Sequence, residues 1–328
     1  MPKEITHWII AEKAYRTLEP KSGLKAIIKQ YKNLYLSGAV IMDTPFYLLY
    51  GNGKDVMYKV AAKLHDNPIN SVDFGARVIA QFPPQMTEAI IALLLGVITH
   101  IHADSSFHPM VFYFSGKKDP ANQKASKSAG YRHHKLETFL DLYFKETLRL
   151  KNMGLFSNVL DKIEMDKKMF LDVLSALYKM DMNIDRVHIE KSLLMHRRIQ
   201  AMFDKNLPRI IFQLLNTIPG LDFREYLSNF YPQHKPKANS LFLAPFSYRH
   251  PVTGENLQHS VTDLETHAIE GILDMFHSIE RYRGEGSSFV EVFRRLKGPN
   301  LYAGVAGRSE SEMKYFDANQ DLMKLIVD

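Results

Sequence analysis

Apolar residues recur along the chain with the period of a helix, and the alternation of a half-buried strand is rare. Ile9, Ile10, Ala14 and Leu18 would share one face of a first amphipathic helix, with Thr6 as its N-cap. The same period predicts further helices over residues 24–35, 56–64, 131–150, 166–179, 184–204, 207–217 and 261–282. The pattern therefore predicts an all-α fold, a multi-helix bundle.

One predicted helix, from Thr87 to Ala103, is apolar on nearly every side, as is typical of a helix at the centre of a bundle. Gln85-Met86-Thr87-Glu88 supplies its start signal. Within it, the run from Ala89 to Ile101 is interrupted at Thr99 and ends in histidines. We therefore expect no stretch of the roughly 20 apolar residues that a membrane span needs.

The region between Pro219 and Glu255 is rich in proline and predicts a loop. A chain of 328 residues suffices for one large domain or two modest ones. Because the candidate metal ligands all precede residue 140, we predict a metal-binding helical region over residues 1–150. Residues 151–328 would form a C-terminal helical region, either a separate unit or an elaboration of the same bundle.

The amino-acid composition restricts which metal ligands and substrates are possible. The hydrophobic share of 45% argues against disorder, and the absence of cysteine excludes disulfides and thiolate ligands. Any metal would be held by nitrogen and oxygen alone. The net charge of +6 is spread along the chain; it favours anionic substrates such as phosphodiesters but falls short of a nucleic-acid footprint. The first residues lack the apolar core of a signal peptide, so we expect a cytoplasmic protein.

Histidine and carboxylate recur at helical spacing. His100, Asp104 and His108 follow one another at intervals of four residues, and His133 and Glu137 repeat that interval. Residues at i and i+4 project from the same helix face. Imidazole and carboxylate are ligands that divalent ions such as zinc prefer. His134, three residues before Glu137, competes with His133 as the ligand. This spacing predicts a metal cluster between helices.

The complete set of candidate ligands is His7, Asp43, His65, His100, Asp104, His108, His133 and Glu137. This set exceeds the four ligands of one tetrahedral zinc but suits two or three ions that share a bridging carboxylate. A cluster of that kind is usually hydrolytic.

The order of these motifs resembles the zinc-dependent phospholipase C family, whose relatives include fungal single-strand nucleases and glycosylphosphatidylinositol-specific phospholipase D. The resemblance covers roughly residues 4–145. It rests on Ile5-Thr6-His7 with Ala11, Gly38-Ala39-Val40-Ile41-Met42-Asp43, Leu64-His65-Asp66, His100-x3-Asp104-x3-His108 and His133-x3-Glu137. The short interval between Asp104 and His108 is similar to the phospholipase D branch.

The resemblance implies a ligand set for each ion. One zinc would be surrounded by Asp43, His65, His100 and Asp104, and a second would be held by His108, His133 and Glu137.

The resemblance also implies that Asp104 bridges to a third zinc. In relatives this ion is bound by the first histidine, here His7, and by the amino group and carbonyl of the mature N-terminal residue. This chain departs from that pattern, because it begins Met1-Pro2 and its single tryptophan, Trp8, follows His7. If Met1 is removed, the amine of Pro2 stands five positions before His7, the separation found in relatives.

The chemistry that follows is metal-assisted phosphoester hydrolysis, with Asp43 as general base or water-orienting residue. We favour a zinc phosphodiesterase acting on a phospholipid or related phosphodiester, with transient contact to a membrane surface. A zinc nuclease on single-stranded nucleic acid is the first alternative, disfavoured by the modest charge. A non-catalytic, metal-stabilised helical module is the second.

The remaining histidines are expected to be surface or hydrogen-bonded residues; they include His102, His188, His196, His234 and His277. The four-residue interval recurs at His259, Asp263 and His267. However, Ser260 and Thr262 look like N-caps, and Thr262 to Glu265 would form a capping box. We predict no metal there, and we interpret 249–255 as a turn fixed by Pro251 and Gly254.

Two aromatic runs, residues 45–50 and 110–114, flank the candidate ligands. They could face a substrate, but core packing is the commoner fate of aromatics in a bundle. Asp66, beside His65, is expected to be a supporting or turn residue rather than a ligand.

Overall fold

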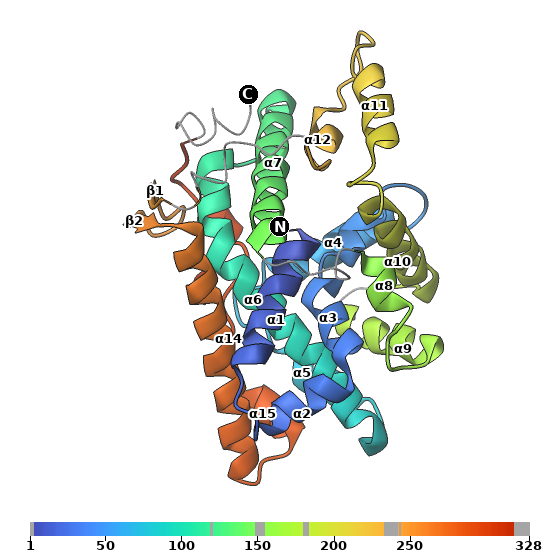
Figure 1. Ribbon diagram of the computed structural model, residues 1–328, viewed down its shortest axis with the longest axis vertical. Coiled ribbons are helices and arrows are strands. Elements are labelled where there is room, and N and C mark those ends of the chain that lie inside the picture. Colours follow the sequence, from blue (N-terminus) through green and yellow to red (C-terminus); the bar gives the residue numbers. More distant parts are fainter. Residues whose placement is uncertain are drawn as a thin grey trace.

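The computed structural model describes residues 3–118, 121–147, 155–179, 184–232, 242 and 244–317. Apart from one two-stranded sheet, its regular elements are helices, which confirms the all-α prediction (Figure 1). The elements are α1 Glu4–Thr17, α2 Gly23–Gln30, α3 Lys32–Ile41, η1 Thr44–Tyr47, α4 Lys54–His65, α5 Phe74–Ala80, η2 Pro84–Met86, α6 Thr87–Ser115, α7 Gln123–Thr147, α8 Phe156–Leu160, α9 Lys167–Tyr178, α10 Arg186–Gln200, α11 Asn206–Leu215, α12 Arg224–Leu227, β1 Phe246–Arg249, β2 Asn256–His259, α14 Val261–Gly284, α15 Phe289–Arg295 and η3 Glu310–Glu312.

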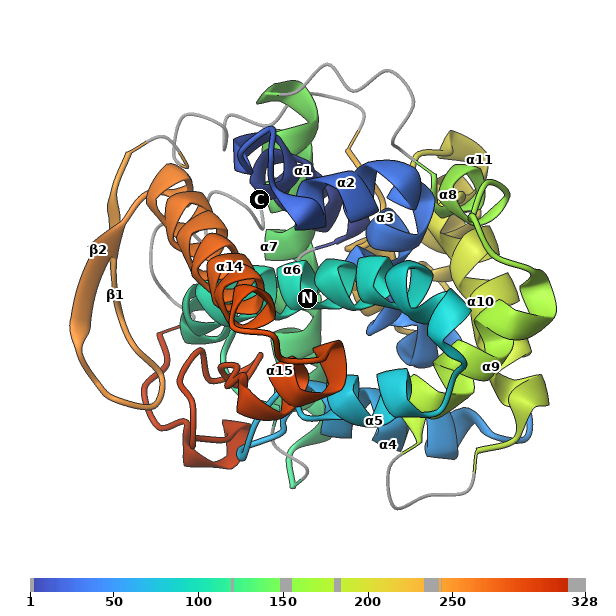
Figure 2. The ribbon, with the colours of Figure 1, turned by 90° about the horizontal axis from the view of Figure 1, so that it is seen from below.

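Helix α6 forms the centre of the bundle, as predicted, and α1, α3, α7 and α14 pack around it (Figures 1 and 2). Every residue from Ala89 to Ile101 is buried, which explains why no polar face interrupts the run. The helix continues twelve residues past the predicted end at Ala103. Pro109 removes only one backbone donor, and the apolar residues after it stay in the core, so the helix runs on to Ser115.

The expectation that no stretch could span a membrane was too strict. Among the described residues, Pro84–Ser115 is long and apolar enough by length and composition. In the fold, 78% of its most apolar window is buried against the rest of the chain. Packing within the bundle accounts for that apolar character.

Helix boundaries differ from prediction where local geometry overrides the period. Thr6 is not an N-cap: α1 begins at Glu4, and the Thr6 hydroxyl donates to Asp141. The helix predicted over residues 24–35 is two helices, broken at Tyr31, whose φ and ψ of −117° and 48° are not helical. The capping box of α14 pairs Ser260 with Asp263 rather than Thr262 with Glu265.

The predicted loop between residues 219 and 255 contains α12 and β1, so that prediction was wrong for these two elements. Strand β1 pairs antiparallel with β2, from Phe246 opposite His259 to Arg249 opposite Asn256. The turn between them has Gly254 at φ 75°, in agreement with the predicted turn.

The C-terminal half packs directly on the N-terminal half. Helix α14 lies along α6, α15 contacts α5, and α10 contacts η1. The boundary at residue 150 stays a prediction, but these contacts place several C-terminal elements beside the candidate ligands.

Candidate metal centre

Four helices and the connection between α3 and η1 bring the eight predicted ligands together. His7 comes from α1, His65 ends α4, and Asp43 lies between α3 and η1. The α6 residues His100, Asp104 and His108 occupy successive turns, and His133 and Glu137 come from α7. All are buried except His133, whose side chain is 15% exposed.

The first cluster comprises Asp43, His65, His100 and Asp104, whose candidate ligand atoms all lie within 4.8 Å of one another. His65 Nε2 is 3.0 Å from Asp43 Oδ1 and 3.5 Å from Asp104 Oδ2. His100 Nε2 is 3.5 Å and 3.2 Å from the same two oxygens. Zinc bonds of about 2.1 Å in a tetrahedron set ligand atoms roughly 3.4 Å apart. The observed spacings fit one small cation.

Backbone carbonyls fix the position of the Nδ1 proton on both imidazoles. His65 Nδ1 donates to the Ala61 carbonyl at 2.7 Å, and His100 Nδ1 donates to the Ala39 carbonyl at 2.9 Å. With Nδ1 as the donor, the Nε2 atoms of the two rings face each other across 3.3 Å, where both can bind one cation. A carbonyl partner on the far nitrogen is the usual support of a metal-bound histidine.

The electrostatics of the first cluster also favour a cation. Burial alone would lower the pKa of His100, but the carboxylates of Asp104 and Asp43 raise it to about 9. The surrounding imidazoles hold the pKa of Asp104 well below its ordinary value in spite of its burial. Two buried carboxylates therefore create a field in which positive charge is strongly stabilised.

Asp104 lies between the two clusters. Its Oδ1 is 3.4 Å from His7 Nε2, and its Oδ2 is 3.8 Å from His108 Nδ1. The His7 ring stacks on His100 at 4.2 Å, and within the described part of the chain neither nitrogen of this buried side chain has a hydrogen-bond partner. The predicted terminal-amine ligand belongs to residues 1–2, outside the described residues.

The second cluster comprises His108, His133 and Glu137. His133 Nε2 lies 2.9 Å from Glu137 Oε1, and His108 Nε2 lies 3.9 Å from the same oxygen. His134 lies farther away, 3.5 Å from Glu137 Oε2, and also approaches Glu225. The geometry therefore places His133 rather than His134 in this cluster.

Neutral imidazole is stabilised in the second cluster. Burial lowers the pKa of His108 to about 3, although Asp104 acts in the opposite direction. Its Nδ1 donates to the Leu301 carbonyl at 2.8 Å, which leaves Nε2 with a lone pair. Burial also lowers the pKa of His133.

Sequence reasoning missed the C-terminal segment that covers both clusters. Leu301 accepts the His108 hydrogen bond, and the Tyr302 ring lies 5.5 Å from the rings of both His65 and His108. Asp66 is a supporting residue, as expected: it accepts hydrogen bonds from Asn300 and from the Glu310 backbone. Sequence periodicity reports only on nearby positions, so it could not predict a contact between His108 and Leu301, which are more than 190 residues apart.

His196 and His277 fit the expected roles, whereas His102 does not, because its Nε2 is buried and has no hydrogen-bond partner among the described residues. His196 is buried and hydrogen-bonded to Glu4 and Thr44, each at 2.9 Å. Asp263 caps α14 by accepting from Ser260, so the copied interval at His259 serves the helix terminus. His234 lies outside the described residues.

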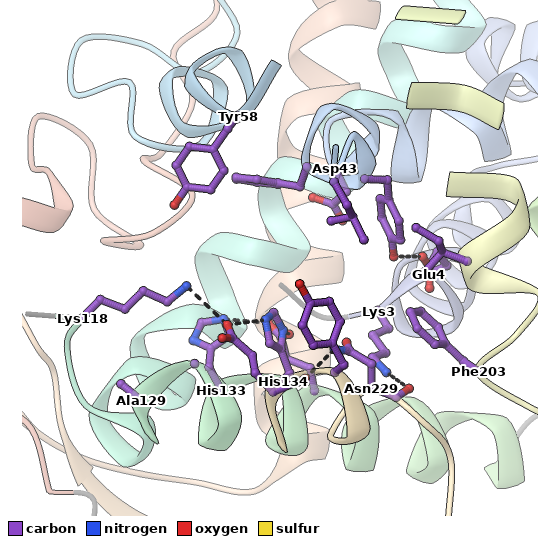
Figure 3. Close-up of a pocket in the computed structure, with 18 of the residues that line it drawn as sticks. Lys3, Glu4, Asp43, Tyr58, Lys118, Ala129, His133, His134, Phe203 and Asn229 are labelled. Atoms are coloured by element: carbon purple, nitrogen blue, oxygen red, sulfur yellow. Dashed lines mark hydrogen bonds and ion pairs between the residues drawn. The ribbon is translucent and has the colours of Figure 1, made fainter. Parts of the chain in front are cut away.

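A pocket of about 590 Å³ opens onto the centre. Figure 3 shows Asp43 on one side of it and His133 and His134 on the other. Its remaining lining is largely aromatic, with charged side chains of both signs, and includes Phe46, Tyr47, Tyr58, Phe112, Phe203, Phe212, Tyr226, Phe230 and Tyr302 with Lys3, Lys54, Lys118, Glu4, Glu225 and Glu310. The aromatic runs are therefore divided: Phe114 is in the core, whereas Phe46 and Phe112 face the pocket.

The sequence model of the family described as zinc dependent phospholipase C matches residues 6–189, more than half of the chain and all eight candidate ligands. Neither a search of curated proteins nor a search of solved structures gave a match.

Proposed function

The chain belongs to the zinc-dependent phospholipase C family, and from this premise we propose that it hydrolyses phosphodiester bonds, with phospholipids as its substrates. The observation that carries the proposal is the paired geometry of the centre. Two groups of histidine and carboxylate are joined at Asp104 and open into one aromatic pocket.

Both clusters fit zinc by their ligand types and spacing. Asp43, His65, His100 and Asp104 would hold one ion, and His108, His133 and Glu137 a second. His7 would join Asp104 at a third. Bound zinc supplies a water of near-neutral pKa and charge neutralisation of the phosphate.

Asp43 has a position that the other members of its cluster lack. It lines the pocket, whereas His65, His100 and Asp104 do not. Its Oδ1 contacts His65 at 3.0 Å. Asp43 is therefore the carboxylate of this cluster placed to orient an attacking water and accept its proton on the substrate side.

The pocket lining supports a phospholipid over a nucleic acid. Tyr58 and Phe112 offer apolar surface to a lipid. Lys54 offers positive charge to a phosphate, whereas Lys118 is paired with Glu225. A nuclease would need a longer basic groove, which a net charge of +6 spread over the chain does not favour.

The test pairs elemental analysis with turnover. We expect at least two zinc ions per chain and hydrolysis of a phosphorylcholine ester that stops on chelation and returns with zinc. His100→Ala and His133→Ala should each lose metal and activity, whereas His277→Ala, an exposed histidine on α14, should keep both. Full activity with no metal after exhaustive chelation would contradict the proposal, as would cleavage of single-stranded oligonucleotides alone.

Asp43→Asn separates the chemistry from metal binding. We expect the variant to keep its fold and most of its metal but to lose turnover by about 100-fold or more, the scale of losing a positioned base. Zinc content and kcat are measured on the same preparation. A parental rate would show that another group activates the water.

A further inference from the structure

Helix α11 has no buried residue although most of its side chains are apolar. Leu207, Ile210, Ile211 and Leu214, here called the docking face, stand at i, i+3, i+4 and i+7 and so share one side of the helix. They are 69%, 45%, 48% and 63% exposed, respectively. Four large aliphatic side chains therefore form one apolar face against solvent.

The docking face is not needed to attach α11 to the fold. Attachment is made by Phe212, whose ring lies 5.6 Å from Phe223, 6.0 Å from Tyr226 and 5.8 Å from Phe230. Figure 1 shows α11 beside α12 at the periphery of the molecule. Among the described residues, nothing buries the outer side of α11. A helix that is apolar on both sides needs a second apolar environment.

The charge around the docking face complements an anionic surface. Residues 205–221 contain Lys205 and Arg209 and no aspartate or glutamate. The acidic residues on either side are each paired with a base, Asp204 with Lys145 and Asp222 with Arg224. Exposed apolar residues extend past the helix at Ile218 and Leu221. Arg209 stands two residues from both Leu207 and Ile211 and so projects from the opposite side of the helix. An apolar face with basic residues on the other face is the signature of a helix that lies in the interface of a bilayer.

The docking face and the pocket lie on opposite sides of the same helix. None of the four docking-face residues lines the pocket, whereas Phe212 on the inner side of α11 does, as does Tyr226 on α12. Protein interfaces favour aromatic anchors and arginine over aliphatic residues, and leucine is rare among their strongest contacts. A lipid surface has no such preference, and aliphatic side chains suit it well.

We propose that α11 docks on the surface of a phospholipid bilayer, with the docking face in the acyl boundary and the mouth of the pocket at the headgroups. Helix α11 follows the family match, which ends at residue 189, so the match does not account for it. The proposal rests on the proposed function for what enters the pocket, but docking itself requires no turnover.

The test is flotation of the zinc-loaded protein with phosphatidylcholine vesicles that contain a minor fraction of phosphatidylglycerol. The double variant Leu207→Glu/Leu214→Glu replaces two exposed residues that do not line the pocket. Ile69→Glu, at a side chain that is 82% exposed elsewhere, is the matched control. We expect vesicle affinity to fall about tenfold or more in the double variant only, and parental binding to weaken with added salt.

Parallel assays separate this proposal from the hydrolytic one. A monomeric phosphorylcholine ester should be cleaved equally by the parent and the double variant, whereas cleavage of vesicle lipid should fall with binding. If the double variant loses vesicle binding but the parent hydrolyses neither substrate, the result would support docking and contradict the proposed function. Equal vesicle binding of all three proteins would overturn docking. So would a parental dimer that the double variant dissociates without a change in lipid binding, since the face would then belong to a second copy.

Discussion

Asp141 anchors the first turn of α1, the helix that carries His7. Its Oδ1 accepts from the Thr6 backbone N–H at 2.8 Å and from the Thr6 hydroxyl at 2.6 Å, and its Oδ2 accepts from the Tyr231 hydroxyl at 2.8 Å. Burial, together with the charge of Glu4, raises the pKa of Asp141 to about 6 in spite of these donors. The folded protein therefore holds this proton more tightly than the unfolded chain does.

This pKa shift predicts a pH dependence of stability. A raised acid pKa contributes stability that is fully present below the unfolded value of 3.8 and is lost as pH rises through about 6. Asp141→Asn has no such proton. The unfolding free energy of the parent minus that of the variant should therefore fall by about 2.4 kcal/mol between roughly pH 4 and pH 7.

Denaturant titrations of the metal-free proteins across this range give the measurement. Asp161→Asn is the control, because it removes an exposed carboxylate paired with Arg197 and should change stability by less than about 1 kcal/mol. A difference between parent and Asp141→Asn that is constant with pH would show that Asp141 is ionised throughout.

The candidate ligands could be predicted from sequence because their spacing is local. An i,i+4 pair shares a helix face whatever surrounds it, so His100 with Asp104, and His133 with Glu137, are adjacent in the fold. The carbonyl that Leu301 provides for His108 could not be predicted, since it depends on how distant segments pack.

At the scale of elements, the crossing of α3 and α6 sets the geometry of the first cluster. A Cβ added to Gly96 would lie 2.0 Å from the Tyr35 carbonyl oxygen, and one added to Gly38 would lie 2.1 Å from that of Leu93. The two helices are therefore in backbone contact. That proximity lets the Ala39 carbonyl reach His100 Nδ1.

Gly96→Ala should separate these helices and weaken zinc binding. Overpacking of this kind costs about 1–3 kcal/mol of unfolding free energy. We also expect a loss of zinc affinity, because the Ala39 carbonyl withdraws from His100. Gly23→Ala is the matched control: it lies in the first turn of α2 and its new Cβ would meet nothing within 4 Å.

Thermal unfolding and zinc competition with a chromophoric chelator measure both effects of Gly96→Ala. A variant with parental zinc affinity but reduced stability would show that the crossing supports the fold without positioning His100.

Long helices were predictable and short ones were not. Helices α10 and α14 repeat their apolar face over several turns, which gives the period a clear signal, whereas α6 was predicted from its long apolar run. Helices α5 and α8 have seven and five residues, too few to show a period, and they form because tertiary contacts bury them.

At the scale of the whole molecule, the C-terminal region completes a centre whose candidate ligands all lie in the N-terminal half. Asn300 holds the connecting turn. Its Oδ1 accepts from the backbone N–H groups of Tyr302 at 2.9 Å and Ala303 at 2.7 Å, and its amide donates to Asp66 at 2.9 Å. This turn presents the Leu301 carbonyl to His108.

Asn300→Ala should therefore loosen a zinc ion that Asn300 does not touch. Without the turn, His108 loses the carbonyl that fixes its tautomer, and such supporting contacts are worth about 10- to 100-fold in metal affinity. In a chelator competition, one zinc ion should leave early while the ion at His65 and His100 stays. Asn216→Ala is the control, because Asn216 also closes a turn by accepting from a backbone N–H, that of Phe223 at 2.8 Å, but belongs to the α11–α12 connection. Identical zinc titrations of parent and Asn300→Ala would show that the N-terminal half holds its metals without this segment.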